Sequence, residues 1–465
     1  MKNRTVRAAA LLVITLVLVF TASFSGGCAK QGGSGRDIVP ADTIVLAVKK
    51  DQASAAGQQA LENCLGEYID AFNKTEPGIK VSVKYYTELP KDTAGIDCLL
   101  LGADDMLLYA ANGLTDAGQY LEAAGIAEEK LAGGARNTAK ISESGTLRMI
   151  PFNYDHAVII ADAGLFSEAG VALPDDDWNL SGFESTAEAL TGRRDGKAYA
   201  GVYMPYYMNY VWQYFCNLLA GSYLTDGRFD FSKAGNAGQA LERMYSMYTH
   251  SYAYSPVLDR SSRICAMSFT FACEPGRNNY SFETEKKTII NPGKQIDELL
   301  AGNRLVLLPL PRSDNGNRTG IADTDFIKGF AVPVTSAKQD MAGKLAAFSL
   351  TAEGQEILIS YFGGIPANRD MWGEAFWRTG VFAGDNAERA LIGVDDGLRD
   401  DFTAALSGDN EIYNKNIRMR TVFSAIMVRE FSGAKGMDRF FKKLAVFQED
   451  ANAVIDGKRP IYTRE

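Results

Sequence analysis

The sequence predicts an α/β fold around a largely parallel sheet, and three observations in its first third support this prediction. Thr43–Lys49 is a short apolar stretch, TIVLAVK, that suits a buried strand. The apolar residues that follow recur every three or four positions, which is the period of one helix face. They are Leu61, Leu65, Tyr68, Ile69 and Phe72. Residues 79–85 then alternate apolar with polar side chains, as a half-exposed strand does. A strand, a helix and a second strand in this order imply a parallel pair.

The elements further along the chain continue this pattern. Glu76-Pro77-Gly78 ends the first helix, because proline and glycine break helices. Residues 96–101 form an apolar strand, and residues 104–111 form a helix that stops at Asn112-Gly113. Further helices are predicted at 163–169, 181–190, 239–248 and 337–350, and further strands at 305–310 and 330–333. The C-terminal quarter reads mostly as helices.

Length and charge limit the classes of protein that fit. The chain has 465 residues, which is enough for two or three domains. Its net charge is −9, and loss of three basic residues with an N-terminal leader would bring it to about −12. Such an acidic surface argues against nucleic acid as a partner. No second apolar run reaches the length of a membrane span.

The chemistry-bearing residues predict a protein that is not an enzyme. Only two histidines occur, His156 and His250, which leaves little room for histidine-based catalysis or zinc binding. The motifs of zinc proteases, serine hydrolases and nucleotide-binding loops are absent. No metal site or cofactor is expected. Six cysteines occur without a C-x-x-C pair. Cys265 and Cys273 are close enough in sequence to bridge, but buried thiols are the favoured state of both.

The N-terminus reads as an export signal followed by an attachment point. Basic residues precede a short apolar run, and small residues follow it, which is the layout of a secretory leader. Ser25-Gly26-Gly27-Cys28 resembles the processing box of bacterial lipoproteins, in which the cysteine becomes the lipidated first residue. Ser25 stands where leucine is usual. Ordinary cleavage near Ala22 and an uncleaved anchor are the alternatives, and all three export the rest of the chain.

Several strings of the sequence resemble the maltose-binding-like class (family 1) of extracellular solute-binding proteins of bacterial carbohydrate ABC importers. They are FNKTEPGIKVSVKYY, GIDCLLLGADDMLLYAANGLTDAGQYL, MIPFNYDHAVIIADAGLFSEAGVALPDDDWNLSGFESTAEALTG, LVLLPLPRSDNG and FAVPVTSAKQDMAGKLAAFSLTAEGQEILISYFGGIPANRD. Their order and spacing span roughly residues 43–370. Two departures from the family pattern stand out. Ala161-Asp162 replaces a Tyr-Asn pair, and an acidic block precedes Trp178.

The resemblance implies a two-lobed periplasmic-binding-protein-like fold (type II) with a ligand cleft between the lobes. Residues 1–27 would be a lipoprotein signal peptide and residues 28–42 a flexible tether. Lobe one would comprise 43–152 and 325–366, and lobe two 153–324 and 367–465. The ligand would lie at strand C-terminal ends and helix N-termini. Binding would favour the closed state.

Ten residues are predicted to contact the ligand, because hydroxyl-rich solutes need polar partners and flat aromatic faces. They follow strands, lie at the crossovers between lobes, or belong to the aromatic stretch MPYYMNYVWQYF. They are Lys50, Asp51, Asp104, Asp105, Tyr154, Asp155, Tyr207, Trp212, Asp323 and Thr324. Capping of helix N-termini is the alternative role of the loop carboxylates. Core packing is the alternative role of the aromatics.

The leading hypothesis is therefore a monomeric, lipid-anchored receptor on the outer face of the membrane or in the periplasm. It would capture a sugar or oligosaccharide and deliver it to an ABC transporter permease. The same fold binding a non-sugar solute, cationic or peptide-like, is one alternative. A secreted carbohydrate-active enzyme with paired carboxylates is a second.

Overall fold

The structure is a computed structural model of the chain. It describes residues 42–109, 113–140, 145–204, 209–233, 235–254, 263–274, 304–398, 426 and 437–456. The predicted leader, Cys28, Tyr207 and much of the predicted helical tail lie outside these residues. No helix within the described ranges is long and apolar enough to cross a membrane.

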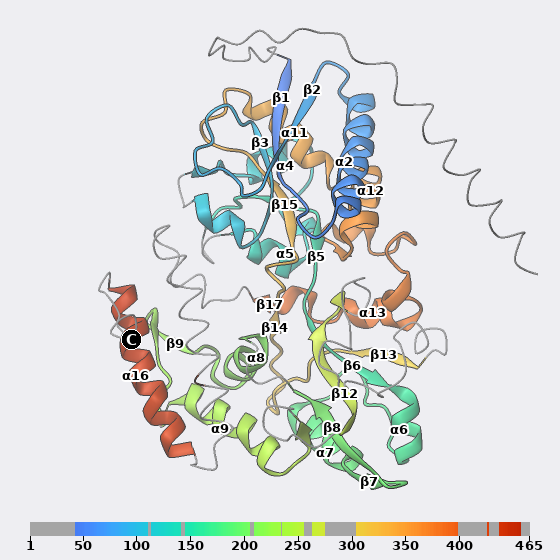
Figure 1. Cartoon of the computed structure of the whole chain (residues 1–465), viewed down its shortest axis with the longest axis vertical. Helices are drawn as coiled ribbons and strands as arrows, with labels where there is room; N and C mark the ends of the chain where they lie inside the picture. The colour runs from blue at the N-terminus through green and yellow to red at the C-terminus, as the bar shows by residue number, and fades with distance from the viewer. Residues whose placement is uncertain are drawn as a thin grey trace, which may run out of the picture. The chain divides into compact units, whose positions relative to one another are not determined.

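The first sheet contains five strands in the spatial order β2-β1-β3-β15-β4. These strands are β1 (Thr43–Lys49), β2 (Lys80–Tyr86), β3 (Cys98–Gly102), β4 (Ile150–Pro151) and β15 (Lys328–Ala331). β1 pairs in parallel with β2 and β3, which confirms the predicted α/β layer. β15 returns from far along the chain and pairs antiparallel to β3 and β4. The C-terminal ends of β1 and β3 therefore share one edge with the N-terminal end of β15 (Figure 1).

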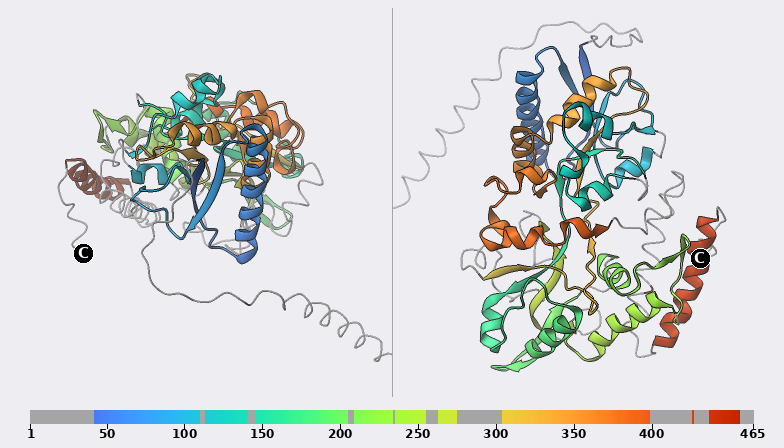
Figure 2. Two further views of the ribbon diagram at one scale, coloured as in Figure 1. Left: turned by 90° about the horizontal axis from the view of Figure 1, so that it is seen from above. Right: turned by 180° about the vertical axis from the view of Figure 1, so that it is seen from behind.

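Helix α2 (Ala55–Thr75) connects β1 to β2 and follows the predicted period. Ser54 caps it by accepting a hydrogen bond from the backbone nitrogen of Gly57. Its buried face includes Tyr68, whose hydroxyl donates to the carbonyl of Leu345 at 2.6 Å and whose ring stacks on Phe330. Each such apolar side chain contributes about 1.5–3 kcal/mol when it is fully buried. α11 (Gln339–Phe348) and α12 (Ala352–Phe362) belong to the same region, and α12 runs beside α2 (Figure 2).

The second sheet has the order β11-β8-β12-β6-β13. In addition, β7 pairs antiparallel with the first residues of β8. Its strands are β6 (Ala157–Asp162), β7 (Gly192–Arg194), β8 (Lys197–Tyr203), β11 (Ala253–Tyr254), β12 (Ile264–Phe271) and β13 (Leu305–Leu308). β8, β11 and β12 are parallel, whereas β6 is antiparallel to both β12 and β13. A second apolar core packs against this sheet and includes Phe183, Trp212 and Phe269.

The helices predicted at 163–169, 181–190 and 239–248 lie around the second sheet within a few residues of their predicted bounds, together with two helices whose bounds were not predicted. They are α6 (Ala163–Ala169), α7 (Leu180–Leu190), α8 (Asn209–Ala220), α9 (Asn236–Thr249) and α16 (Met437–Ile455). The helix predicted at 104–111 is present as a 3-10 helix within that range. The chain there forms the 3-10 helix η1 (Asp105–Tyr109), a tighter turn directly behind β3.

Short elements complete the described fold. They are α4 (Gly118–Ala123), η2 (Glu128–Lys130), α5 (Gly133–Thr138), β9 (Leu224–Thr225), β10 (Arg228–Phe229), η4 (Arg369–Met371), η5 (Gly380–Phe382), α13 (Asp385–Leu391) and η6 (Val394–Asp396).

The chain passes between the two sheets at two described places. It runs from β4 through β5 (Asn153–Tyr154) to β6, and from β13 through β14 (Gly320–Ile321) to β15. β5 pairs with β16 (Ile365–Pro366), and β14 pairs with β17 (Gly397–Leu398). The predicted lobe boundaries stay a prediction. The apolar cluster around the first sheet also contains Trp377 and Phe382, which the predicted division places in lobe two.

Candidate ligand-binding site

The shared edge of β1, β3 and β15 carries a cavity of about 210 Å³. Three of the predicted ligand contacts line it, namely Lys50, Asp51 and Asp105. Lys328 begins β15 directly opposite Gly102, so it enters the cavity from the returning strand. The loops after β1 and β3 and the first residue of β15 thus bring together charged side chains that are far apart in sequence.

Asp51 is held against the first turn of α2. Its carboxylate accepts a hydrogen bond from the backbone nitrogen of Ala53 at 2.7 Å, and its own backbone nitrogen donates to the side chain of Gln58 at 3.0 Å. A Cβ on Gly57 would lie 2.2 Å from the other carboxylate oxygen, so glycine leaves room for this group. The hydrogen bond from Ala53 closes a local turn just before the N-cap residue Ser54 and does not cap the helix, and it fixes the carboxylate at the cavity wall.

Lys328 is the most constrained charge at this edge. Its ammonium donates to the carbonyl of Asp325 at 2.7 Å. A Cβ on Gly102 would lie 3.0 Å from the ammonium and 3.6 Å from a carboxylate oxygen of Asp105, so both groups border the space over this glycine. Burial lowers the pKa of Lys328, and the carboxylate of Asp105 opposes this effect. The ammonium is thus partly desolvated, a setting in which its hydrogen bonds gain strength.

The rim of the site is more exposed and more solvated. Lys49 forms an ion pair with Glu88 at 2.8 Å, and this contact raises the pKa of the lysine. Lys50 is exposed, and its backbone nitrogen donates to Tyr86 at 2.7 Å. Asp104 precedes η1 without lining the cavity, although its charge acts on Lys328.

Two aromatic residues at the end of α12 complete the cavity wall. Tyr361 and Phe362 both line it and are both partly buried. The hydroxyl of Tyr361 donates to the carbonyl of Gly57 at 3.3 Å, which ties α12 to α2. Phe362 packs its ring against Phe152 at 5.3 Å. Sequence reasoning missed these rings and Lys328, and the signal for the lysine was its position at the start of the late apolar strand.

Four of the predicted ligand contacts lie on the segments that join the two sheets. They are Tyr154, Asp155, Asp323 and Thr324, and the two aspartates form hydrogen bonds within these segments and to Cys273. The carboxylate of Asp155 accepts hydrogen bonds from the backbone nitrogens of His156 at 2.8 Å and Cys273 at 3.1 Å. The backbone of Asp323 donates to the carbonyl of Asp155 at 2.9 Å, and the Asp323 carboxylate accepts from Phe326 at 3.3 Å. Tyr154, Asp155, Asp323 and Thr324 are all buried, and none of them lines the cavity.

The predicted aromatic contact Trp212 lies in the core of the second sheet. It is fully buried, and its ring meets Tyr223 at 5.0 Å and Phe231 at 5.9 Å in edge contacts. The structure therefore does not bring it to the cavity at the edge of the first sheet. Its predicted neighbour Tyr207 lies outside the described residues.

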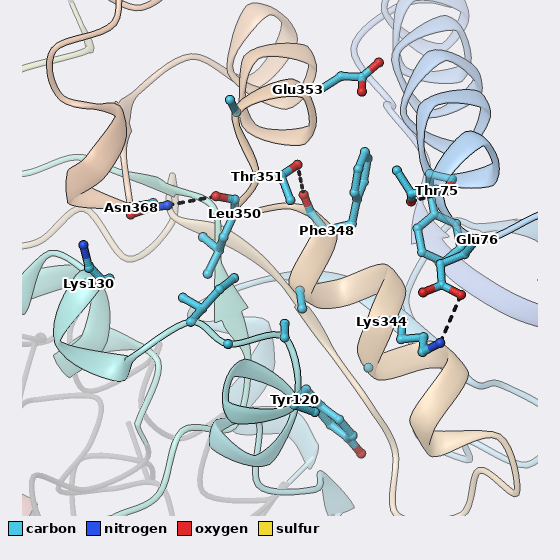
Figure 3. A pocket seen from close by; sticks show the side chains of 18 of the residues that line it. Thr75, Glu76, Tyr120, Lys130, Lys344, Phe348, Leu350, Thr351, Glu353 and Asn368 are labelled. Carbon is cyan, nitrogen blue, oxygen red and sulfur yellow. Dashed lines mark hydrogen bonds and ion pairs between the residues drawn. The ribbon is translucent and has the colours of Figure 1, made fainter.

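A larger cavity of about 1,150 Å³ lies elsewhere on the first sheet's helices (Figure 3). It is bordered by the C-terminal end of α2, where Glu76 pairs with Lys344 at 3.0 Å, and by Tyr120 and Asn368. The site described above lies at the other end of α2, a helix about 30 Å long. None of the nine predicted residues that the structure describes lines this larger cavity.

The two cysteines that are close enough in sequence to form a disulfide do not form one. Cys265 and Cys273 are both buried and unbridged, which confirms the buried thiol as their state. Burial raises the pKa of the Cys265 thiol well above its usual range, so this thiol stays protonated. Within the described ranges, no cluster of histidine, cysteine and carboxylate side chains is arranged to hold a metal ion.

Comparison with known proteins assigns the class. The sequence model of the bacterial extracellular solute-binding protein family matches residues 67–380, more than half of the chain. The chain therefore belongs to the bacterial extracellular solute-binding proteins, whose α/β fold has two lobes. A comparison with curated proteins gives no match.

Solved structures share the fold at low sequence identity. The sugar-binding protein MalE from Xanthomonas citri is 17% identical, with 91% of this chain and 100% of that chain covered and a TM-score of 0.64. An ABC substrate-binding protein from Listeria monocytogenes in complex with cycloalternan is 17% identical, with coverages of 90% and 99% and a TM-score of 0.58. UgpB from Mycobacterium tuberculosis, in complex with glycerophosphocholine, is 15% identical, with coverages of 90% and 98% and a TM-score of 0.58.

Proposed function

We propose that this protein captures a sugar or oligosaccharide at the edge of its first sheet and delivers it to the permease of an ABC importer. The observation that carries the proposal is the cavity in which Asp51, Asp105 and Lys328 converge beside two aromatic rings. Family membership and the sugar-binding relatives support the class of ligand.

The residue types at the cavity suit a hydroxyl-rich solute. Each sugar hydroxyl that leaves water needs a hydrogen-bond partner, and carboxylate and ammonium groups supply acceptors and donors. The C–H faces of a sugar pack well on aromatic rings. Tyr361 and Phe362 offer such surface next to Lys328. These groups bind and orient a solute, and the proposal assigns them no catalytic step.

The second half of the binding site would come from lobe two, with 43–152 plus 325–366 as lobe one and 153–324 plus 367–465 as lobe two. Contacts made only when both lobes touch the solute would favour a closed state, and this difference would signal occupancy to the permease. We infer export and a lipid anchor on Cys28 from the leader sequence. A monomer fits this role.

A cationic solute is the second candidate, and one observation favours it. Asp105, Asp325 and Asp323 all act on Lys328, so carboxylates exceed ammonium groups around this position. The relative that binds glycerophosphocholine shows that this fold also accepts a ligand with a cationic group.

Calorimetric titration with a panel of mono- and oligosaccharides, choline-containing solutes and polyamines tests the proposal. We expect a saccharide to bind the wild-type protein, and Lys328→Gln and Asp105→Asn to weaken its binding at least tenfold. Lys130→Gln is the matched control, because this lysine pairs with Asp370 at the other cavity. Binding of choline compounds or polyamines without saccharide binding would replace the sugar by a cationic solute. Saccharide binding that all three variants retain would place the site elsewhere.

A further inference from the structure

A small cavity lies where the segments that join the two sheets meet. It has a volume of about 10 Å³, close to the space that one water molecule occupies. Its walls come from the start of β6, from the residues just before β14 and from the turn after α13. The polar and backbone walls include His156, Arg318, Thr319, Gly320 and Gly393.

Thr319 brings a buried hydroxyl to this place. The residue is only 7% exposed, and its hydroxyl oxygen has no hydrogen-bond partner among the residues that the structure describes. A buried hydroxyl without a partner is unfavourable, so native proteins pair such groups with protein atoms or with ordered water. A cavity of water size beside this residue offers the second solution.

The surroundings of the cavity are polar enough to hold a water molecule. The Arg318 side chain is only 14% exposed, and burial lowers its pKa. The His156 ring is buried, and one of its nitrogens lies 2.8 Å from the carbonyl of Ala390. A buried water typically makes about three hydrogen bonds to such groups.

We propose that one ordered water molecule occupies this cavity and hydrogen-bonds to the Thr319 hydroxyl. The water then links the residues that precede β14 to the turn after α13. β14 pairs with β17, which follows that turn, so the water reinforces a connection that the backbone also makes. The site is independent of the ligand cavity and of its chemistry.

Tyr154 provides an internal contrast. It is fully buried, and its hydroxyl also has no hydrogen-bond partner in the described part of the chain. A Cβ on Gly134 or on Gly397 would lie 2.1 Å or 1.8 Å from the hydroxyl oxygen, so the two glycines enclose it. Tyr154 does not line the cavity. Its hydroxyl is thus closely packed by backbone on these two sides, and removing it should have the opposite effect on stability.

Thermal unfolding of three variants tests the proposal, together with a crystal structure of the wild-type protein at high resolution. Thr319→Val keeps the volume and removes the hydroxyl, and we expect its melting temperature to fall by about 2 °C. Tyr154→Phe should raise the melting temperature. Thr319→Ser keeps the hydroxyl and should retain the water density.

We expect electron density for one water within hydrogen-bond distance of the Thr319 oxygen. Its absence from the wild-type crystal structure would overturn the proposal. A Thr319→Val protein as stable as the wild type, or more stable, would overturn it as well. If Thr319→Val fails to fold, the wild-type density and the Thr319→Ser protein still decide the matter.

Discussion

Mild acid is expected to weaken the folded state through His156, the histidine that the fold buries. Burial disfavours the charged imidazolium and lowers the pKa of His156 to about 4, while the hydrogen bond to the carbonyl of Ala390 acts in the opposite direction. An unfolded chain binds the proton near the ordinary histidine pKa of about 6.5. Between these two values the unfolded state binds more protons, so stability falls as the pH falls.

The size of this effect follows from the separation of the two pKa values. Relative to pH 7.5, the linkage predicts a loss of about 2 kcal/mol at pH 5 and about 3 kcal/mol at pH 4. The whole free energy of unfolding of a protein is typically about 5–15 kcal/mol. The linkage therefore predicts that this one buried imidazole contributes substantially to the loss of stability in acid.

Urea denaturation at pH 7.5, 6 and 5 measures this loss. His156→Gln can still donate to the Ala390 carbonyl but does not titrate, so we expect it to lose about 2 kcal/mol less than the wild type between pH 7.5 and 5. His250→Gln is the control for replacing a histidine, because His250 is exposed. Equal pH dependence in the wild type and His156→Gln would refute the reasoning.

Three further predictions concern other parts of the chain. Asp162 is fully buried and pairs with Arg304 at 3.0 and 3.1 Å, so Asp162→Asn should lower the free energy of unfolding by about 2 kcal/mol; an unchanged urea midpoint would contradict this. Gly397→Ala should destabilise the wild type more than it destabilises a Tyr154→Phe protein, because the nearest ring atom is then 3.0 Å from the new Cβ instead of an oxygen at 1.8 Å. Equal costs in a double-mutant cycle would contradict that geometry. Cys28→Ser should release the protein from membranes without changing ligand affinity, and a variant that still sediments with membranes would exclude this cysteine as the anchor.

The sequence predicts the first sheet well because its signals are local. The apolar period of residues 61–72 corresponds to the buried face of α2, since that helix packs on one side only. The meeting of Lys50, Asp51 and Asp105 at one cavity was predictable, because loops after parallel strands share one edge of a sheet, and their role as ligand contacts stays a prediction. Their local geometry agrees with this rule.

The positions that could not be predicted from the sequence depend on contacts between segments that are far apart in the chain. Lys328 reaches the site only because β15 returns antiparallel and pairs opposite Gly102, a register that no local pattern encodes. Trp212 looked available because aromatic residues lie on several sides of its segment. The hairpin of β9 and β10 supplies Tyr223 and Phe229 near the same core, so more than one side of α8 is covered. The polar crossover residue Asp155 is engaged by backbone donors, which residue type alone does not reveal.

The most direct test of the central claim is calorimetric titration of Gly102→Ala with a saccharide that binds the wild-type protein. The new methyl group would lie 3.0 Å from the Lys328 ammonium and 3.6 Å from the Asp105 carboxylate, within the space assigned to the solute. Because the nearest atom is the end of a flexible side chain, the fold should tolerate the change. We predict an unchanged melting temperature and an affinity at least tenfold weaker. Wild-type affinity in Gly102→Ala would contradict the assignment of the ligand to this edge of the first sheet.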